Sequence, residues 1–115
     1  MSQAHAIRLN VEPIRSLAFG SIGAAYMGIG TQIDNPVRIL RIQNLTDVLL
    51  FFSFDGINDH EVLPYNSFLL LDITANKARE HGYYLAEGTR VYVKEGPNPA
   101  SSGSVYVTVY YGAIE

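Results

Sequence analysis

The sequence predicts an all-β protein: an antiparallel β-sandwich or jelly-roll-like single domain with an extended N-terminal segment. Three observations support this prediction. Short stretches alternate apolar and polar residues with period two, as half-buried strands do. Turn residues separate these stretches at intervals of about 8–12 residues, which is typical of sandwiches and small barrels. Helical periodicity is nearly absent from the 115 residues, a length that fits one domain.

The N-terminal quarter has the least regular pattern. Residues His5–Val11 alternate and are closed by Pro13, so they predict a strand. The segment 16–30 that follows is apolar and rich in glycine, which indicates either a bulged strand or a pliable segment packed against neighbouring backbone. We therefore divide the chain into residues 1–30, an arm or a set of edge strands, and residues 31–115, the sandwich domain.

Further strands are expected after the turn at Asp34-Asn35-Pro36. Residues 48–54 are apolar on both faces, which indicates a central strand covered from both sides, and Asp55-Gly56 after them is a strong tight-turn signal. Residues 74–82 are the one segment compatible with a helical turn. The strands expected after the turn cover residues 37–44, 48–54, 60–63, 68–73, 83–86, 89–94 and 104–111.

The composition narrows the classes of function. The absence of cysteine excludes disulfides and cysteine-ligated metal centres, and favours an intracellular origin or stabilisation by assembly. The formal net charge of -3, without a run of Lys or Arg, argues against nucleic acid as a partner. The N-terminus has no signal-peptide pattern, and no apolar stretch approaches the ~20 residues of a membrane span. Charged residues make up only 17%, against about 25% in an average globular protein, which suggests that much of the surface is covered by something other than water.

No group of residues in the sequence predicts catalysis, so we expect a non-enzymatic protein without a cofactor or a metal ion. The segment Asp55–His60 combines two carboxylates, an amide and an imidazole, which form either a metal loop or, as we expect, a hairpin turn. No serine lies in a G-x-S-x-G setting, and the glycines of residues 16–30 form no phosphate-binding motif. The histidines are far apart in the sequence: His5, His60 and His81.

Tyrosine is the most informative residue type, with eight in the chain and no tryptophan. In the last two expected strands the valines occupy one face, whereas Tyr92, Tyr106 and Tyr110 occupy the other. If residues 95–103 join these strands as a long hairpin connection, the three tyrosines form one aromatic patch. The patch is either an aromatic ladder within the chain or a protein–protein interface, because tyrosine buries apolar area and keeps a polar tip.

Two further residues are candidates for the same interface. Tyr26 and Met27 lie in the glycine-rich segment, which we expect to pack along the domain or to reach a neighbouring subunit. Extended arms of this kind can add a strand to the sheet of a neighbour.

Four stretches carry a resemblance to a known group of proteins. They read RIQNLTDVLLFFSFDGINDHEVLP, NSFLLLDITANK, GYYLAEGTRVYVKEG and SGSVYVTVYYG, and together they cover about two-thirds of the chain. In these stretches the chain resembles small virion proteins of tailed bacteriophages. The resemblance implies a non-enzymatic β-structured protein, present in many copies as capsid decoration or in the head–tail connector.

We therefore expect a structural virion protein that is made in the host cytoplasm. Its expected partners are major capsid or portal/connector subunits and further copies of itself, and neither nucleic acid nor a membrane. One alternative is a head–tail connector or tail-ring subunit. Another is a carbohydrate-binding β-module that uses the face of Tyr92, Tyr106 and Tyr110.

Overall fold

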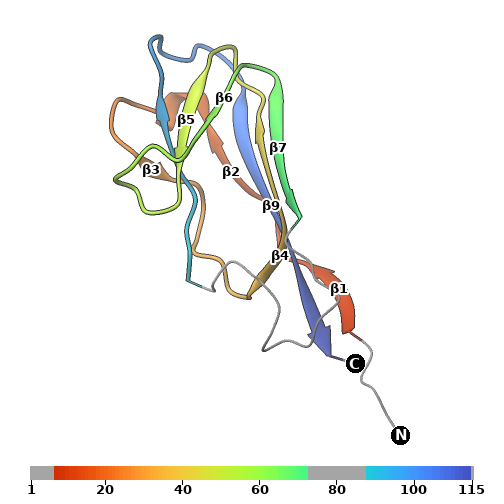
Figure 1. The fold of residues 1–115 in the computed structure, drawn as a ribbon. Coiled ribbons are helices and arrows are strands. Elements are labelled where there is room, and N and C mark those ends of the chain that lie inside the picture. Colours follow the sequence, from red (N-terminus) through yellow and green to blue (C-terminus); the bar gives the residue numbers. More distant parts are fainter. Residues whose placement is uncertain (1–6, 73–87, 115) are drawn as a thin grey trace, which may run out of the picture.

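Two antiparallel sheets pack face to face in the computed structural model, which describes residues 7–72 and 88–114 (Figure 1). Sheet A has the strand order β1-β9-β4-β7, with β2 also pairing with β9, and sheet B has the order β3-β8-β5-β6. A short 3-10 helix, η1, spans Phe19–Ser21. The strands are β1 Ile7–Val11, β2 Arg15–Ala18, β3 Met27–Gly28, β4 Val37–Asn44, β5 Leu50–Ser53, β6 Glu61–Leu63, β7 Ser67–Asp72, β8 Tyr92–Glu95 and β9 Ser104–Ile114.

The strand order is that of a jelly roll. Strands β1 and β2 pair with successive parts of β9 and together act as one broken strand. Counted in this way, the described residues form eight strands. Each strand lies in the other sheet from the strand before it, except that β5 and β6 share sheet B. The prediction of an all-β, jelly-roll-like sandwich is confirmed.

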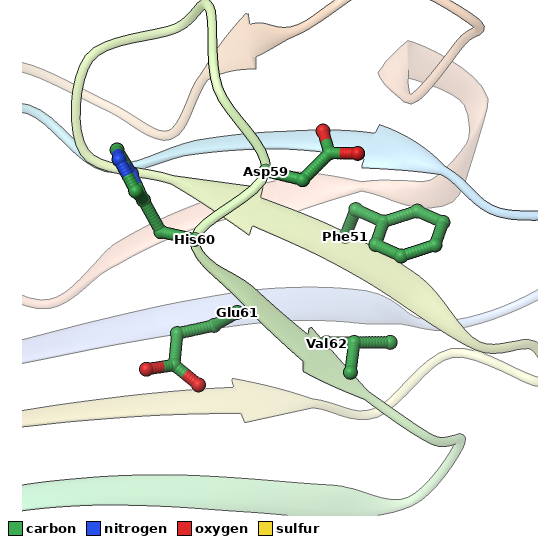
Figure 2. Close-up of a pocket in the computed structure, with 5 residues that line it drawn as sticks. All are labelled: Phe51, Asp59, His60, Glu61 and Val62. Carbon is green, nitrogen blue, oxygen red and sulfur yellow. The ribbon is translucent and has the colours of Figure 1, made fainter.

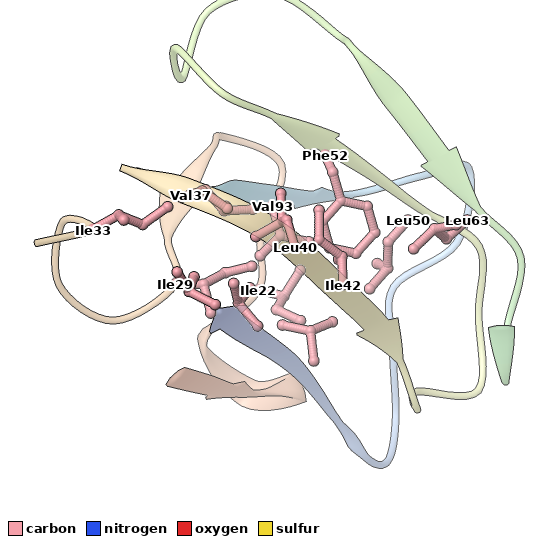
Figure 3. Close-up of a cluster of buried hydrophobic side chains, with 14 residues drawn as sticks. Ile22, Ile29, Ile33, Val37, Leu40, Ile42, Leu50, Phe52, Leu63 and Val93 are labelled. Atoms are coloured by element: carbon pink, nitrogen blue, oxygen red, sulfur yellow. The ribbon is translucent and has the colours of Figure 1, made fainter. Parts of the chain in front are cut away.

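The core lies between the sheets because the alternating strands turn their apolar residues toward each other. In sheet A, Leu40 and Ile42 of β4 lie opposite Val109 and Val107 of β9, and all four are almost fully buried. Sheet B supplies the facing layer of buried side chains (Figure 3). Its main members are Leu50, Phe52, Val91 and Val93.

Most of the expected strands are present, but β5 is shorter than the expected 48–54, and β8 begins at Tyr92 and not at residue 89. Strand β4 covers the expected residues 37–44 and turns Leu40 and Ile42 inward. The expectation that residues 48–54 are covered on both faces is wrong at Phe51, which is only half-buried on the outer surface of sheet B. The expected helical turn at 74–82 and the strand at 83–86 lie outside the described residues.

Residues 7–30 contribute strands to both sheets. Strands β1 and β2 lie at the edge of sheet A, and β3 lies at the edge of sheet B. Between and beyond them, Ile22 and Ile29 enter the core, and the Ile29 N–H donates to the Val91 carbonyl at 2.8 Å. The described part of the N-terminal segment therefore supplies one edge of each sheet and adds Ile22 and Ile29 to the core.

A buried ion pair ties this segment to the loop before β4. The Arg15 Nη2 group lies 2.7 Å from Glu12 Oε1, and both side chains are less than a tenth exposed. Arg15 also donates to the carbonyls of Thr31 and Gln32, and Glu12 Oε2 accepts from Asn35 Nδ2. These bonds use most of the polar atoms of a pair that would otherwise be costly to bury.

Candidate functional site

The three candidate tyrosines of the late strands lie on opposite sides of the molecule. Strand β8 belongs to sheet B and β9 to sheet A, so residues 95–103 cross between the sheets and do not form a hairpin connection. The valines of both strands point to the shared core, and the tyrosines therefore point away from each other. The single patch expected for Tyr92, Tyr106 and Tyr110 does not exist, and the carbohydrate-binding alternative loses the face on which it rested.

The outer face of sheet A is unusually apolar for an exposed surface. The register brings Val11, Tyr110 and Ile39 into one row across β1, β9 and β4, and Tyr106, Gln43 and Phe68 into another across β9, β4 and β7. We call this surface the apolar face. Its apolar residues are Leu9, Val11, Ile39, Phe68, Leu70, Tyr106 and Tyr110.

Several side chains of the apolar face are largely exposed to solvent. Phe68 is 64% exposed, Val11 56%, and Leu9 and Leu70 are each 53% exposed. Leu9 and Val11 lie on β1 and Phe68 and Leu70 on β7, so these exposed side chains line the two edges of the face. Tyr106 and Tyr110 are half-buried between them. The face thus has the composition of an interface core, with aliphatic and aromatic residues and few charges.

A guanidinium group lies at the centre of the apolar face. Arg41 sits in the middle row, between Thr108 of β9 and Leu70 of β7. Its Nη2 group donates to Thr108 Oγ1 at 3.5 Å, and its buried Nε has no acceptor among the described residues. A partner that covers the apolar face would gain by bringing an acceptor oxygen to the half-buried guanidinium, since a charged group that loses contact with water needs a hydrogen-bond partner.

The outer face of sheet B has a different character, because its polar and aromatic residues bind one another. The Tyr26 hydroxyl donates to Asp59 Oδ1 at 2.5 Å, and Lys94 Nζ lies 3.0 Å from the same oxygen. The Lys94 ammonium also lies 4.8 Å from the centroid of the Tyr26 ring and 5.8 Å from that of Phe51. Burial and the bond to Asp59 raise the pKa of Tyr26. Tyr26 therefore has its contacts within the chain, while the adjacent Met27 is 49% exposed.

Tyr92 is also packed within the chain. The guanidinium carbon of Arg90 lies 5.7 Å from the centroid of its ring, and Arg90 Nε donates to the Gly30 carbonyl. A Cβ atom at Gly56 would approach the ring to 3.3 Å, and the φ of 76° at this residue favours glycine. Tyr92 therefore packs within the chain, but not in the ladder expected with Tyr106 and Tyr110.

The loop Asp55–His60 forms a hydrogen-bonded turn. Asp55 Oδ1 accepts from the N–H groups of Ile57 and Asn58, and these two bonds, Asn58 first, lower the pKa of Asp55. His60 Nδ1 accepts from the Phe54 N–H at 3.0 Å. Across residues 7–72 and 88–114, no three His, Cys, Asp or Glu side chains form a group that could hold a metal ion.

A pocket beside this loop does not gather reactive groups. It is lined by Phe51, Asp59, His60, Glu61 and Val62. The carboxylates of Asp59 and Glu61 point to opposite sides (Figure 2), and that of Asp59 is already bound to Tyr26 and Lys94. We therefore place the candidate site on the apolar face.

Of the residues on the apolar face, only Tyr106 and Tyr110 were predicted from the sequence. The residues of this face that were not predicted are Leu9, Val11, Ile39, Arg41, Phe68 and Leu70. The sequence of β7 does indicate exposed apolar residues. All four residues of Phe68–Leu71 are apolar, and successive residues of a strand point to opposite faces, so two of them must point outward if one face is exposed. Only the sheet order shows that β7 lies at an edge.

Comparisons of the chain with protein-family models, with curated proteins and with solved structures found no match. Within the described part of the chain, no helix has the length and apolar character needed to span a membrane.

Proposed function

We propose that the protein is a non-enzymatic structural component of a bacteriophage virion, which binds neighbouring subunits as a decoration or minor head protein. The observation that carries the proposal is the apolar face, where Leu9, Val11, Phe68 and Leu70 are each more than half exposed. The resemblance of residues 37 onward to small virion proteins of tailed bacteriophages gives the class of particle. The jelly-roll order adds support, because capsid proteins are among the proteins that use it, alongside lectins and cupins.

The apolar face suggests how the contact is made. A neighbouring capsid or connector subunit would cover the exposed aliphatic residues together with Tyr106 and Tyr110, whose hydroxyl groups can form hydrogen bonds across the contact. A carboxylate or carbonyl oxygen of that subunit would bind the half-buried guanidinium group of Arg41. The partner surface is therefore expected to be apolar with an acceptor at its centre.

The particle itself provides the test. Phage particles produced from the genome that encodes this chain are purified by density gradient, and their proteins are identified and quantified by mass spectrometry. We expect the chain to sediment with intact particles. Many copies per shell would indicate decoration, a small ring-like number would indicate a connector or tail-ring subunit, and absence from the particles would refute the proposal.

A pair of variants tests the apolar face. Val11→Lys places a charge on the face, whereas Ile57→Lys places it on the β5–β6 loop, where the side chain is 79% exposed. Purified Ile57→Lys protein should rebind particles that lack the chain as the natural protein does, and Val11→Lys should bind at least ten times more weakly. Equal binding by both variants would show that the contact lies elsewhere.

A further inference from the structure

Among the described residues, strand β7 is the last strand of sheet A. It pairs with β4 on one side, and within the described residues no strand pairs with its other side. The strand runs along the border of the sandwich (Figure 1). An edge strand turns a row of backbone N–H and C=O groups outward, and these groups can pair with another strand.

The sequence of β7 lacks the features that normally protect an edge. Residues Ser67–Asp72 read SFLLLD, with no proline, no lysine and one charge at the last position. Phe68 and Leu70 are exposed, while Leu69 and Leu71 pack against the core from the inner side. A strand of this kind is suited to continuing the sheet in a second molecule.

We propose that β7 pairs antiparallel with β7 of a second copy of this chain, so that the two A sheets become one continuous sheet. This inference rests on the proposed function, because a virion would hold many copies of the chain close together. It adds to that function a specific contact between two copies. A contact in which both copies use the same strand is self-complementary and closes as a two-fold dimer.

The sequence selects one register for this pairing. A two-fold axis perpendicular to the sheet keeps the apolar faces of both copies on the same side of the joined sheet. Residues that point outward in one copy therefore pair with residues that point outward in the other. Centred on Leu69, the pairing sets Phe68 opposite the second copy's Leu70 on the outer side, and Ser67 opposite its Leu71 on the inner side. Centred on Leu70, it would set Asp72 opposite Phe68, which is a poorer match.

The size of the contact predicts a weak dimer. Six residues along one edge bury less than the about 1,200 Å² of a stable complex, so the free protein should dimerise only at high concentration. In an array of many copies, the other contacts of each subunit raise the effective concentration for this one.

Cysteine cross-linking tests the register, because the natural chain contains no cysteine. Phe68→Cys and Leu70→Cys proteins are mixed in equal amounts and oxidised. Opposite residues have Cβ atoms about 4.5–5.5 Å apart, whereas like residues are diagonal neighbours about 7–8 Å apart. Among the cross-linked dimers, those that join a Phe68→Cys protein to a Leu70→Cys protein should therefore be more frequent than random pairing of the two proteins would make them. They should also form faster than disulfides between two copies of Val11→Cys, a variant at the opposite side of the sheet.

A matched pair of lysine variants tests the dimer without a cross-link. Leu70→Lys and Leu9→Lys change residues of the same type and of equal exposure, 53%, on the same face, but only Leu70 lies on β7. In sedimentation at increasing concentration, the natural protein and Leu9→Lys should dimerise alike, and Leu70→Lys should stay monomeric with an unchanged circular dichroism spectrum.

Three results would overturn the proposal. They are a natural protein that stays monomeric at millimolar concentration, random pairing in the cross-linking mixture, and equal loss of the dimer in both lysine variants, which would indicate packing of face on face. The particle experiment is independent of these tests. If the chain is found in particles but forms no β7 dimer, only this inference is refuted. If the chain forms the β7 dimer but is absent from particles, only the proposed function is refuted.

Discussion

At the scale of single residues, the buried Glu12–Arg15 pair shows how a charged contact is made tolerable inside a small domain. Glu12 is 5% and Arg15 7% exposed, and their partners come from the chain between Thr31 and Asn35. Burial alone would raise the pKa of Glu12, but the hydrogen bonds from Asn35 and Arg15 outweigh it and the pKa is lowered. The carboxylate is therefore stabilised in its charged form by folding.

This pair predicts a pH dependence of stability. Because the folded pKa of Glu12 is lowered, its contribution is present above its ordinary pKa of 4.5 and is lost as the pH falls through the folded value. Glu12→Gln should lower the free energy of unfolding at pH 7 by about 2–4 kcal/mol, since it leaves Arg15 without its counter-charge. The difference between variant and natural protein should shrink below pH 4 in urea titrations, and a constant difference would contradict the assignment.

At the scale of elements, one buried asparagine joins three segments at the end of β4. Asn44 is fully buried, and its Nδ2 group donates to the carbonyls of Val48, Leu63 and Pro64. Its Oδ1 accepts from the N–H and the hydroxyl of Thr46. The side chain thus fixes the turn into β5 and the corner between β6 and β7, which sets the position of the β7 edge.

Removal of this side chain should be costly. Asn44→Ala leaves several buried polar groups without a partner and should lower the free energy of unfolding by about 3 kcal/mol. Asn98→Ala, at an exposed position of the loop before β9, is the matched control and should change it by less than about 0.5 kcal/mol. Chemical denaturation followed by circular dichroism measures both, and similar values for the two variants would contradict the role of Asn44.

At the scale of the whole molecule, the N-terminal segment completes the sandwich. Strands β1 and β2 pair with β9, β3 pairs with β8, and Ile29 is 1% exposed in the shared core. Residues 7–30 therefore contribute to the stability of the same unit as the rest of the described chain.

Two isoleucines of contrasting burial test this unity. Ile29→Ala should lower the free energy of unfolding by about 2–5 kcal/mol, because it leaves a cavity in the core. Ile57→Ala, at a position that is 79% exposed, should change it by less than about 0.5 kcal/mol. Thermal unfolding should remain a single transition for both variants, and a separate early transition in Ile29→Ala would show that the segment unfolds independently.

By itself, the sequence determined the all-β class, the strands 37–44 and 104–111 with their buried faces, and the turn at Asp55-Gly56, because period-two alternation and turn chemistry are local properties. Only the tertiary structure decided that β8 and β9 lie in different sheets, that Tyr92 and Tyr106 point in opposite directions, and that β7 is an edge. Sheet order depends on contacts between residues far apart in the chain. For this reason the sequence shows that the segment GSVYVTVYYG, residues 103–112, has one valine face and one tyrosine face. It does not show which strands lie beside the tyrosine face and make it part of an apolar surface.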